Sequence, residues 1–325
     1  MNIRERRAIH EAARNTLSRA EKPRRIALAY AAICCGMALV ATIGDSLLGS
    51  RISSAVGLSN IGLRSILSTS QTLLFLANLL VTACLTMGYH TAILSITRGF
   101  DATPHTLKAG FRHFGPVLRA LFLQAFTYLG AAFAATYLSS AIFMATPFAD
   151  PFLEAMEPYM PSIIGSSIVV DETILAATAE SLVPMLWILA AVSLVLIVPL
   201  YYRFRMVNFC LADDPRLGAL FAMTKSRRLM RRNCFALFRL DLDLWWFYLG
   251  QVAVNLICFG DLLLPLAGVS FPWSNTVSYY LFYVLSLAAQ MALYSFGMNR
   301  VYAVYAVAYD ALQEDLPKPN VPVQM

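Results

Sequence analysis

Residues 208–246 read NFCLADDPRLGALFAMTKSRRLMRRNCFALFRLDLDLWW and lie between two long apolar runs of the chain. The stretch contains seven basic and four acidic residues. Four arginines stand together near its centre, namely Arg227, Arg228, Arg231 and Arg232. Basic residues beside a hydrophobic span resist translocation and so orient a protein in a bilayer. The stretch therefore predicts a membrane protein that keeps this connection in the cytoplasm.

The composition supports the same class of protein. Hydrophobic residues make up 58% of the 325 residues and charged residues 14%, whereas soluble domains average about 45–50% and 25%. A net charge of +6 also occurs in nucleic-acid-binding proteins, but here the basic residues form short blocks beside apolar runs. This arrangement is typical of membrane topology and of contact with anionic lipid. We therefore expect phospholipid headgroups, and not nucleic acid, as partners.

Six stretches are long and apolar enough to cross a bilayer, which takes about 20 residues. They cover residues 26–48, 71–96, 117–145, 182–202, 242–268 and 277–297. The spans would place 23 Lys and Arg residues on one side of the membrane and 2 on the other. The sequence thus predicts an all-α, polytopic protein of the cell membrane, with six transmembrane helices, both termini in the cytoplasm, and additional amphipathic interfacial helices.

Both ends of the chain are predicted to lie outside a single membrane domain of residues 26–312. Residues 1–25 carry eight basic residues, and Ile9, Ala13 and Leu17 share one face of a helix. This helix either lies on anionic headgroups or packs, solvated, under the bundle. Residues 313–325 form a Pro-rich cytoplasmic tail. None of the six cysteines lies in an outer connection, and no CxxC pair offers a metal site, so neither disulfides nor a cofactor are expected.

The outer connection of residues 146–181 contains six acidic and no basic residues. Two interpretations stay open. The acids form a vestibule for cations or peptides, or they are simply tolerated outside, where nothing opposes their translocation.

The spacing within residues 208–246 predicts an amphipathic helix. Asp213 or Asp214 would cap a helix that begins at Pro215, because proline is favoured at the first helical position. Leu220 and Phe221 belong to its apolar face, which can lie against the membrane. The four arginines fall in its last turns, where their charge complements the helix dipole. Anionic headgroups are their predicted ligand, since the planar guanidinium matches phosphate, and a membrane-protein partner is the alternative.

A second helix is predicted from about Phe235 through LDLDLWW into the fifth span. Trp245 and Trp246 fit the aromatic belt at a membrane interface. Asp241 and Asp243 stand at the entrance of the span, where carboxylates are costly unless they are paired. We expect them to be structural acids, with Arg239 and the four arginines near in sequence.

The segment DDPRLGALFAMTKSRRLMRRNCFALFRLDLDLWW resembles the bacterial integral-membrane proteins grouped as domain of unknown function 975. The residues that match the family pattern are Ser226, Met230, Asn233, Leu237, Phe238, Leu240, Asp241 and Leu242. The chain departs from the pattern at Arg232, where the family has Gly, and at Asp243-Leu244, where it has Ser-Phe. The family's Trp falls on Phe247, with Trp246 one residue early. The resemblance implies a multi-pass membrane protein without an assigned activity.

Neutral amides are the main polar groups within the predicted spans. Those singled out as candidate intramembrane polar residues are Asn78, Gln251, Asn255 and Gln290. We expect them to join helices by hydrogen bonds, whereas a set that faced one cavity would indicate a transport path.

The functional hypotheses follow from these features. The sequence contains no HExxH, GxSxG or GxxxxGK[ST] motif, and no residue set supports a catalytic role. The first hypothesis is a non-enzymatic membrane protein that acts through lipid or protein partners, with a role in envelope stress or self-protection included. The alternative is a transporter or transporter subunit with a polar intramembrane path. A third, an enzyme acting on lipid, would rest on Asp241 and Asp243.

Overall fold

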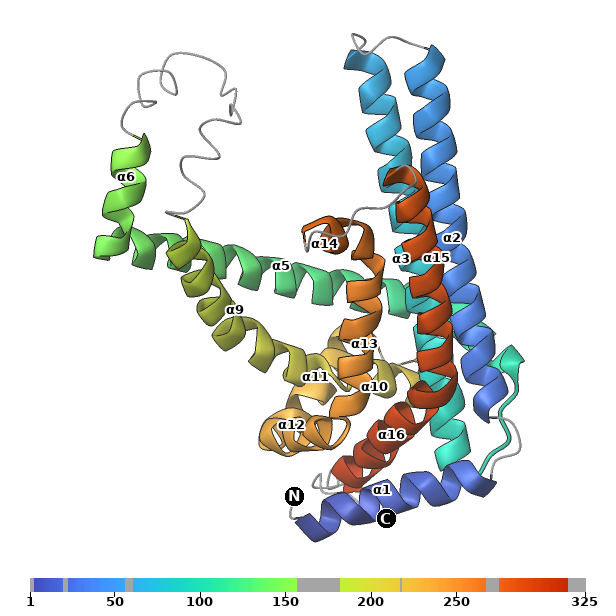
Figure 1. The fold of residues 1–325 in the computed structure, drawn as a ribbon. Helices are drawn as coiled ribbons and strands as arrows, with labels where there is room; N and C mark the ends of the chain where they lie inside the picture. The colour runs from blue at the N-terminus through green and yellow to red at the C-terminus, as the bar shows by residue number, and fades with distance from the viewer. Residues whose placement is uncertain are drawn as a thin grey trace. The chain divides into compact units, whose positions relative to one another are not determined.

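The computed structural model describes residues 3–19, 23–55, 61–156, 182–216, 218–266 and 275–314, which form helices and contain no β-strand (Figure 1). The all-α class is thus confirmed. The longer helices are α1 (Ile3–Arg19), α2 (Pro23–Ala55), α3 (Ile61–Thr97), α5 (Phe114–Met144), α9 (Val183–Phe204), α15 (Asn275–Leu293) and α16 (Asn299–Glu314). The shorter ones are η1 (Pro104–Lys108), α4 (Ala109–Arg112), η2 (Pro147–Ala149), α6 (Asp150–Met156), α10 (Val207–Asp213), α11 (Ala219–Met230), α12 (Cys234–Asp243), α13 (Trp245–Cys258), α14 (Gly260–Leu266) and the π-helix η4 (Tyr294–Met298).

Five helical segments in the described residues are long and apolar enough to cross a membrane. They are Pro23–Gly44, Gln71–Thr97, Phe114–Met144, Val183–Asp213 and Val277–Glu314. Each contains or overlaps one of the predicted spans, because the same run of apolar residues that favours the bilayer also favours continuous helix.

The fifth predicted span, residues 242–268, differs from the other five. Its backbone is interrupted at Leu244 and again at Phe259, so that α13 has 14 residues and α14 has 7. At Leu244 the N–H turns back to the carbonyls of Asp241 and Leu242, which ends α12 before α13 begins. An α-helix of 14 residues is about 21 Å long, less than the hydrocarbon thickness of about 30 Å. Helix α13 alone is therefore too short to span.

The chain divides into two compact units: residues 1–121 with 206–325, and residues 122–205. In the first unit α2, α3 and α15 lie side by side (Figure 1). Its core is richest where the second half of α3 meets α10 and α16, with α11 packed on α10. The largest fully buried side chains there include Tyr89, Phe209, Met230, Tyr305 and Tyr309.

Helix α1 belongs to the first unit and packs against α16 and α3. Ile9 and Ala13 on its apolar face are 8% and 1% exposed. The apolar face of α1 is thus turned toward the bundle, and its contact with headgroups stays a prediction. Helix α1 ends at Arg19, and α2 begins at Pro23.

The second unit consists of the greater part of α5 with η2, α6 and α9. Tyr128 of α5 and Phe204 of α9 meet edge to face at 6.1 Å, and Phe143 of α5 meets Phe152 of α6 at 6.0 Å. The most apolar window of α9 buries none of its side chains within the described chain. Such a helix suits an environment of lipid.

Some sequence predictions concern residues outside the described ones. They include four of the six acids of the outer connection (Glu157, Asp171, Glu172 and Glu180) and most of the C-terminal tail. The domain boundaries at residues 25 and 312 stay predictions.

Candidate functional site

The helix that carries the arginines begins later than predicted. Helix α10 ends at Asp213, and Pro215 lies in the turn that follows, so Pro215 is not the first residue of a helix. The Oδ1 atom of Asp214 accepts a hydrogen bond of 3.0 Å from the backbone N–H of Arg216. An aspartate that bonds its own backbone two residues on forms a turn. Helix α11 then starts at Ala219, with Gly218 as its N-cap in extended conformation.

Helix α11 has one buried face and one exposed face. Ala222 and Ser226 on the inner face are fully buried, whereas Leu220 and Phe221 on the outer face are 67% and 71% exposed. Ser226, which matches the family pattern, lies inside α11 on its buried face, where a small side chain fits. The predicted apolar face therefore exists and points away from the protein.

The four arginines lie at the junction of α11 and α12, and all four are exposed. Arg227 and Arg228 occupy the last turn of α11, and Arg231 and Arg232 lead to Asn233, the N-cap of α12. We call residues 227–232 the arginine turn. The side-chain amide of Asn233 donates to the carbonyl of Leu229 at 3.0 Å. This bond ties the junction to the end of α11.

Exposed apolar and basic side chains also alternate along α12. Phe235 and Leu242 are 62% and 54% exposed, and Trp245, just beyond the helix, is 61% exposed. The Arg239 guanidinium lies 4.4 Å above the Phe235 ring. The exposed residues of α11, the arginine turn and α12 thus include both apolar and cationic groups, as is typical of segments at a membrane interface. We call this set of exposed residues the interfacial surface.

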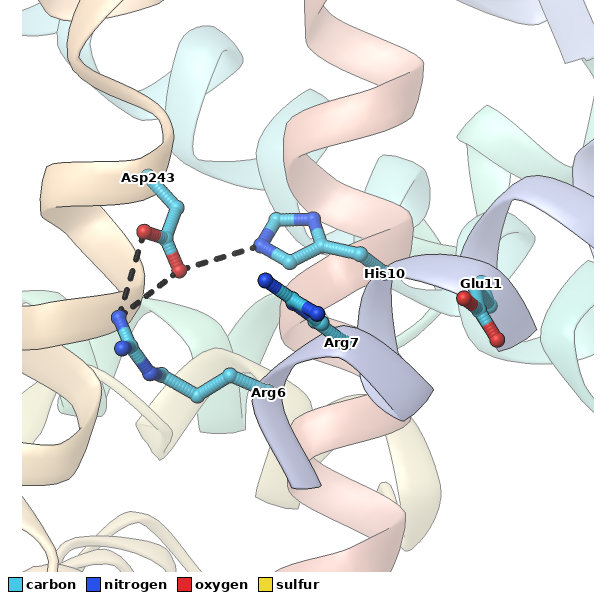
Figure 2. Close-up of a pocket in the computed structure, with 5 residues that line it drawn as sticks. All are labelled: Arg6, Arg7, His10, Glu11 and Asp243. Atoms are coloured by element: carbon cyan, nitrogen blue, oxygen red, sulfur yellow. Dashed lines mark hydrogen bonds and ion pairs between the residues drawn. The ribbon is translucent and has the colours of Figure 1, made fainter. Parts of the chain in front are cut away.

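Asp243 pairs with the N-terminal helix and not with the nearby arginines. Its carboxylate accepts from Nη1 of Arg6 at 3.1 and 3.3 Å, and its Oδ2 lies 3.6 Å from Nε2 of His10 (Figure 2). The same Nη1 also donates to the carbonyl of Arg239 at 3.4 Å. A cavity of about 360 Å³ lies here, lined by Arg6, Arg7, His10, Glu11 and Asp243. The arginines that lie near Asp243 in the sequence were the expected partners, and this expectation is wrong for Asp243. Its side chain on α12 points toward α1 and binds residues of that helix.

Asp241 faces a different part of the protein. It accepts a short hydrogen bond from the hydroxyl of Tyr305 on α16, and that hydroxyl also meets the hydroxyl of Tyr248 on α13. Tyr305 is 1% exposed, so the carboxylate helps to satisfy a buried hydroxyl. The two carboxylates of the LDLDL element therefore bind to different helices, which suits structural acids.

A third cluster, which sequence reasoning missed, joins α3, α10, α11 and α16. Arg98 reaches Asp213 at 2.6 Å through Nη1 and Asp310 at 2.8 Å through Nη2. The Oδ2 atom of Asp213 also accepts from the amide of Gln313 at 2.9 Å and from Lys225 at 3.5 Å. The hydrogen bonds to Asp310 and to Asp213 hold the pKa of the Arg98 guanidinium above its ordinary value. A signal was present in the sequence, since Arg98 follows the second predicted span directly and Asp213 comes soon after the fourth, on the same predicted side.

Comparison with protein families assigns the chain. A family model described as "Protein of unknown function (DUF975)" matches residues 12–290. The chain belongs to the DUF975 family. The match covers the arginine turn, the LDLDL element and all but the end of the sixth predicted span, in agreement with the resemblance seen in the sequence. Neither the curated proteins nor the solved structures contain a match.

Two of the amides in this DUF975 protein join helices. The side chains of Gln251 on α13 and Gln290 on α15 exchange two hydrogen bonds, of 2.9 and 3.1 Å. Asn78 accepts from Thr82 of its own helix at 3.5 Å, and Asn255 is exposed. The structure therefore does not bring the four amides together.

Two further observations concern the packing of Trp246 and the search for a metal site. The Trp246 ring lies against Gly297, where an added Cβ would come within 3.0 Å of it, so this side chain packs on the π-helix. Of Trp245 and Trp246, Trp245 alone is largely exposed. Among the described residues, no group of three or more His, Cys, Asp or Glu side chains could hold a metal ion.

Proposed function

We propose that this DUF975 protein is a non-enzymatic protein of the bacterial cell membrane whose interfacial surface binds anionic lipid headgroups on the cytoplasmic side. A protein partner in the same membrane, and a role in envelope stress, fit within this proposal. The observation that carries it is the composition of the interfacial surface: residues 219–245 expose the four arginines together with Leu220, Phe221 and Trp245. Apolar side chains enter the headgroup region while guanidinium groups bind phosphate.

The proposed topology has six crossings with both termini in the cytoplasm. Helices α13 and α14 would supply the crossing that no single helix provides. In support, α13 packs along α15, and the reciprocal amide pair of Gln251 and Gln290 lies within this contact. The strong bias of Lys and Arg toward one side supports the orientation.

The other hypotheses receive less support. A transport path would need polar side chains that face one cavity, whereas Gln251 and Gln290 satisfy each other. A reaction at Asp241 and Asp243 would need both carboxylates at one site, whereas one is engaged by Tyr305 and the other by Arg6.

The test compares lipid retention by the purified full chain. Native mass spectrometry would count phosphatidylglycerol and phosphatidylcholine molecules retained by the natural chain, by a variant with Arg227, Arg228, Arg231 and Arg232 all changed to Gln, and by one with all four changed to Lys. Each juxtamembrane basic residue contributes about 1 kcal/mol of attraction to an anionic surface. We expect the Gln variant to lose most retained phosphatidylglycerol and the Lys variant to keep part of it. Equal retention by all three proteins would refute the proposal.

A further inference from the structure

The cavity between α1 and α12 has the features of a binding site distinct from the arginine turn. Two arginines and a histidine of α1 line it, together with Glu11 and, from α12, Asp243. In Figure 2 the two carboxylates stand at opposite ends of the group, with the cationic side chains and the imidazole between them. Its volume of about 360 Å³ is ample for a phosphate group.

Hydrogen-bond donors in this cavity exceed the acceptors that the described chain offers. Arg6 makes all its recorded hydrogen bonds through Nη1, which leaves Nε and Nη2 without a described partner. Arg7 is exposed and has no hydrogen bond or ion pair with any described residue. The buried Nε2 atom of His10 makes no hydrogen bond with a described residue, and it lies 3.6 Å from Oδ2 of Asp243. A buried polar atom without a hydrogen bond requires an explanation, and a bound water, ion or ligand provides one.

The donor set is better suited to phosphate than to a carboxylate. Two guanidinium groups offer planar forks of N–H donors, and phosphate binds such forks through pairs of oxygens. A single carboxylate has two oxygens, and the cavity already holds one in Asp243, which occupies Nη1 of Arg6. A phosphate group provides enough oxygens for the remaining donors of Arg6, for Arg7 and for His10.

We infer that the cavity formed by Arg6, Arg7, His10, Glu11 and Asp243 is a binding site for a phosphate group, carried by a lipid headgroup or free in solution. Asp243 orients Arg6 from across the cavity, and Arg7 supplies the principal contact. The site uses none of the residues of the arginine turn, so phosphate binding at this cavity can be tested separately from the proposed function.

Isothermal titration calorimetry on the full chain in uncharged detergent tests the inference. The probes are inorganic phosphate, dihexanoyl phosphatidylglycerol and, as an uncharged reference, dihexanoylglycerol. We expect saturable binding of at least one phosphate probe and none of the reference. Binding of inorganic phosphate as tight as that of the lipid assigns the site to free phosphate, and binding of the lipid alone assigns it to headgroups.

Three substitutions on α1 separate a binding role from a structural one. Arg7→Gln should weaken binding about tenfold, the effect of one charge-assisted hydrogen bond. Glu11→Gln should tighten it severalfold, because it removes a negative charge from the cavity, whereas undocking of α1 would weaken binding in both variants. Arg14→Gln, an exposed arginine of the same helix that does not line the cavity, should leave it unchanged. Absence of binding by both phosphate probes, or equal affinities of the Arg7 and Arg14 variants, would overturn the inference.

Discussion

Two glycines allow the connection after α3 to fold back onto that helix, and alanine at either position should destabilise the protein. An added Cβ at Gly88 of α3 would lie 2.1 Å from the carbonyl oxygen of Leu107, and one at Gly110 of α4 would lie 1.8 Å from that of Cys84. Real Cβ atoms essentially never approach a heavy atom to under 3.0 Å. Both obstacles are backbone atoms, so no change of rotamer can relieve the contact.

The expected cost follows from this geometry. Each substitution forces the connection to move from α3 by roughly 1 Å, and overpacking of this kind costs about 1–3 kcal/mol or more. The helical preference of alanine over glycine returns about 0.5–1 kcal/mol. We therefore expect a net loss of about 2 kcal/mol for Gly88→Ala and for Gly110→Ala. The double variant should lose less than the sum, because both changes disrupt the same contact.

Thiol labelling and thermal unfolding of the purified protein measure this effect. Cys84 lies where α4 packs on α3 and is 1% exposed. In both variants we expect maleimide to label Cys84 faster than in the natural protein, as measured by peptide mass spectrometry. The midpoint of thermal unfolding should fall in the same two variants. Gly36→Ala is the matched control, since a Cβ at this position of α2 meets nothing within 4 Å. If both variants label Cys84 as slowly as the natural protein does and unfold at the same midpoint, then the segment of η1 and α4 does not pack on α3 as described.

Three further predictions concern the polar contacts and the topology. Arg98→Gln should lower the free energy of unfolding by about 1–3 kcal/mol, because Asp310 then loses the cation it pairs with and Asp213 keeps only Lys225 of its described cations; a midpoint in chemical denaturation equal to that of the natural chain would contradict this. Gln251→Leu alone should cost about 1 kcal/mol by leaving Gln290 without its partner, while the double Leu variant should be nearly neutral; a double-variant cycle with no coupling would count against the pair. A fluorescent reporter fused at the C-terminus should be active and an alkaline phosphatase fusion inactive, and the opposite pattern would exclude a cytoplasmic C-terminus.

The sequence predicted well those features that depend on residues close together in the chain. Apolar length is enough to identify five of the long helices, and a basic block marks an exposed junction, because both properties depend on residues that are neighbours in the chain. It failed at Pro215, where an aspartate side chain bonded its own backbone and delayed the helix by several residues. It also failed to predict the partner of Asp243, because Arg6 and His10 are remote in sequence and reach it only after α1 has packed on α16.

The ion pairs of the first unit join helices that are far apart in the sequence. The acids with recorded ion pairs in the described chain are engaged by cations from other elements: Asp213 and Asp310 by Arg98, and Asp243 by Arg6. Each of these three carboxylates is therefore held by a residue outside the arginine turn. Because Asn233 bonds the end of α11 and Ser226 is buried beneath it, the turn is held at the surface in a defined position. If the proposed function holds, a basic segment fixed in this way binds an anionic surface with little further ordering of its own groups.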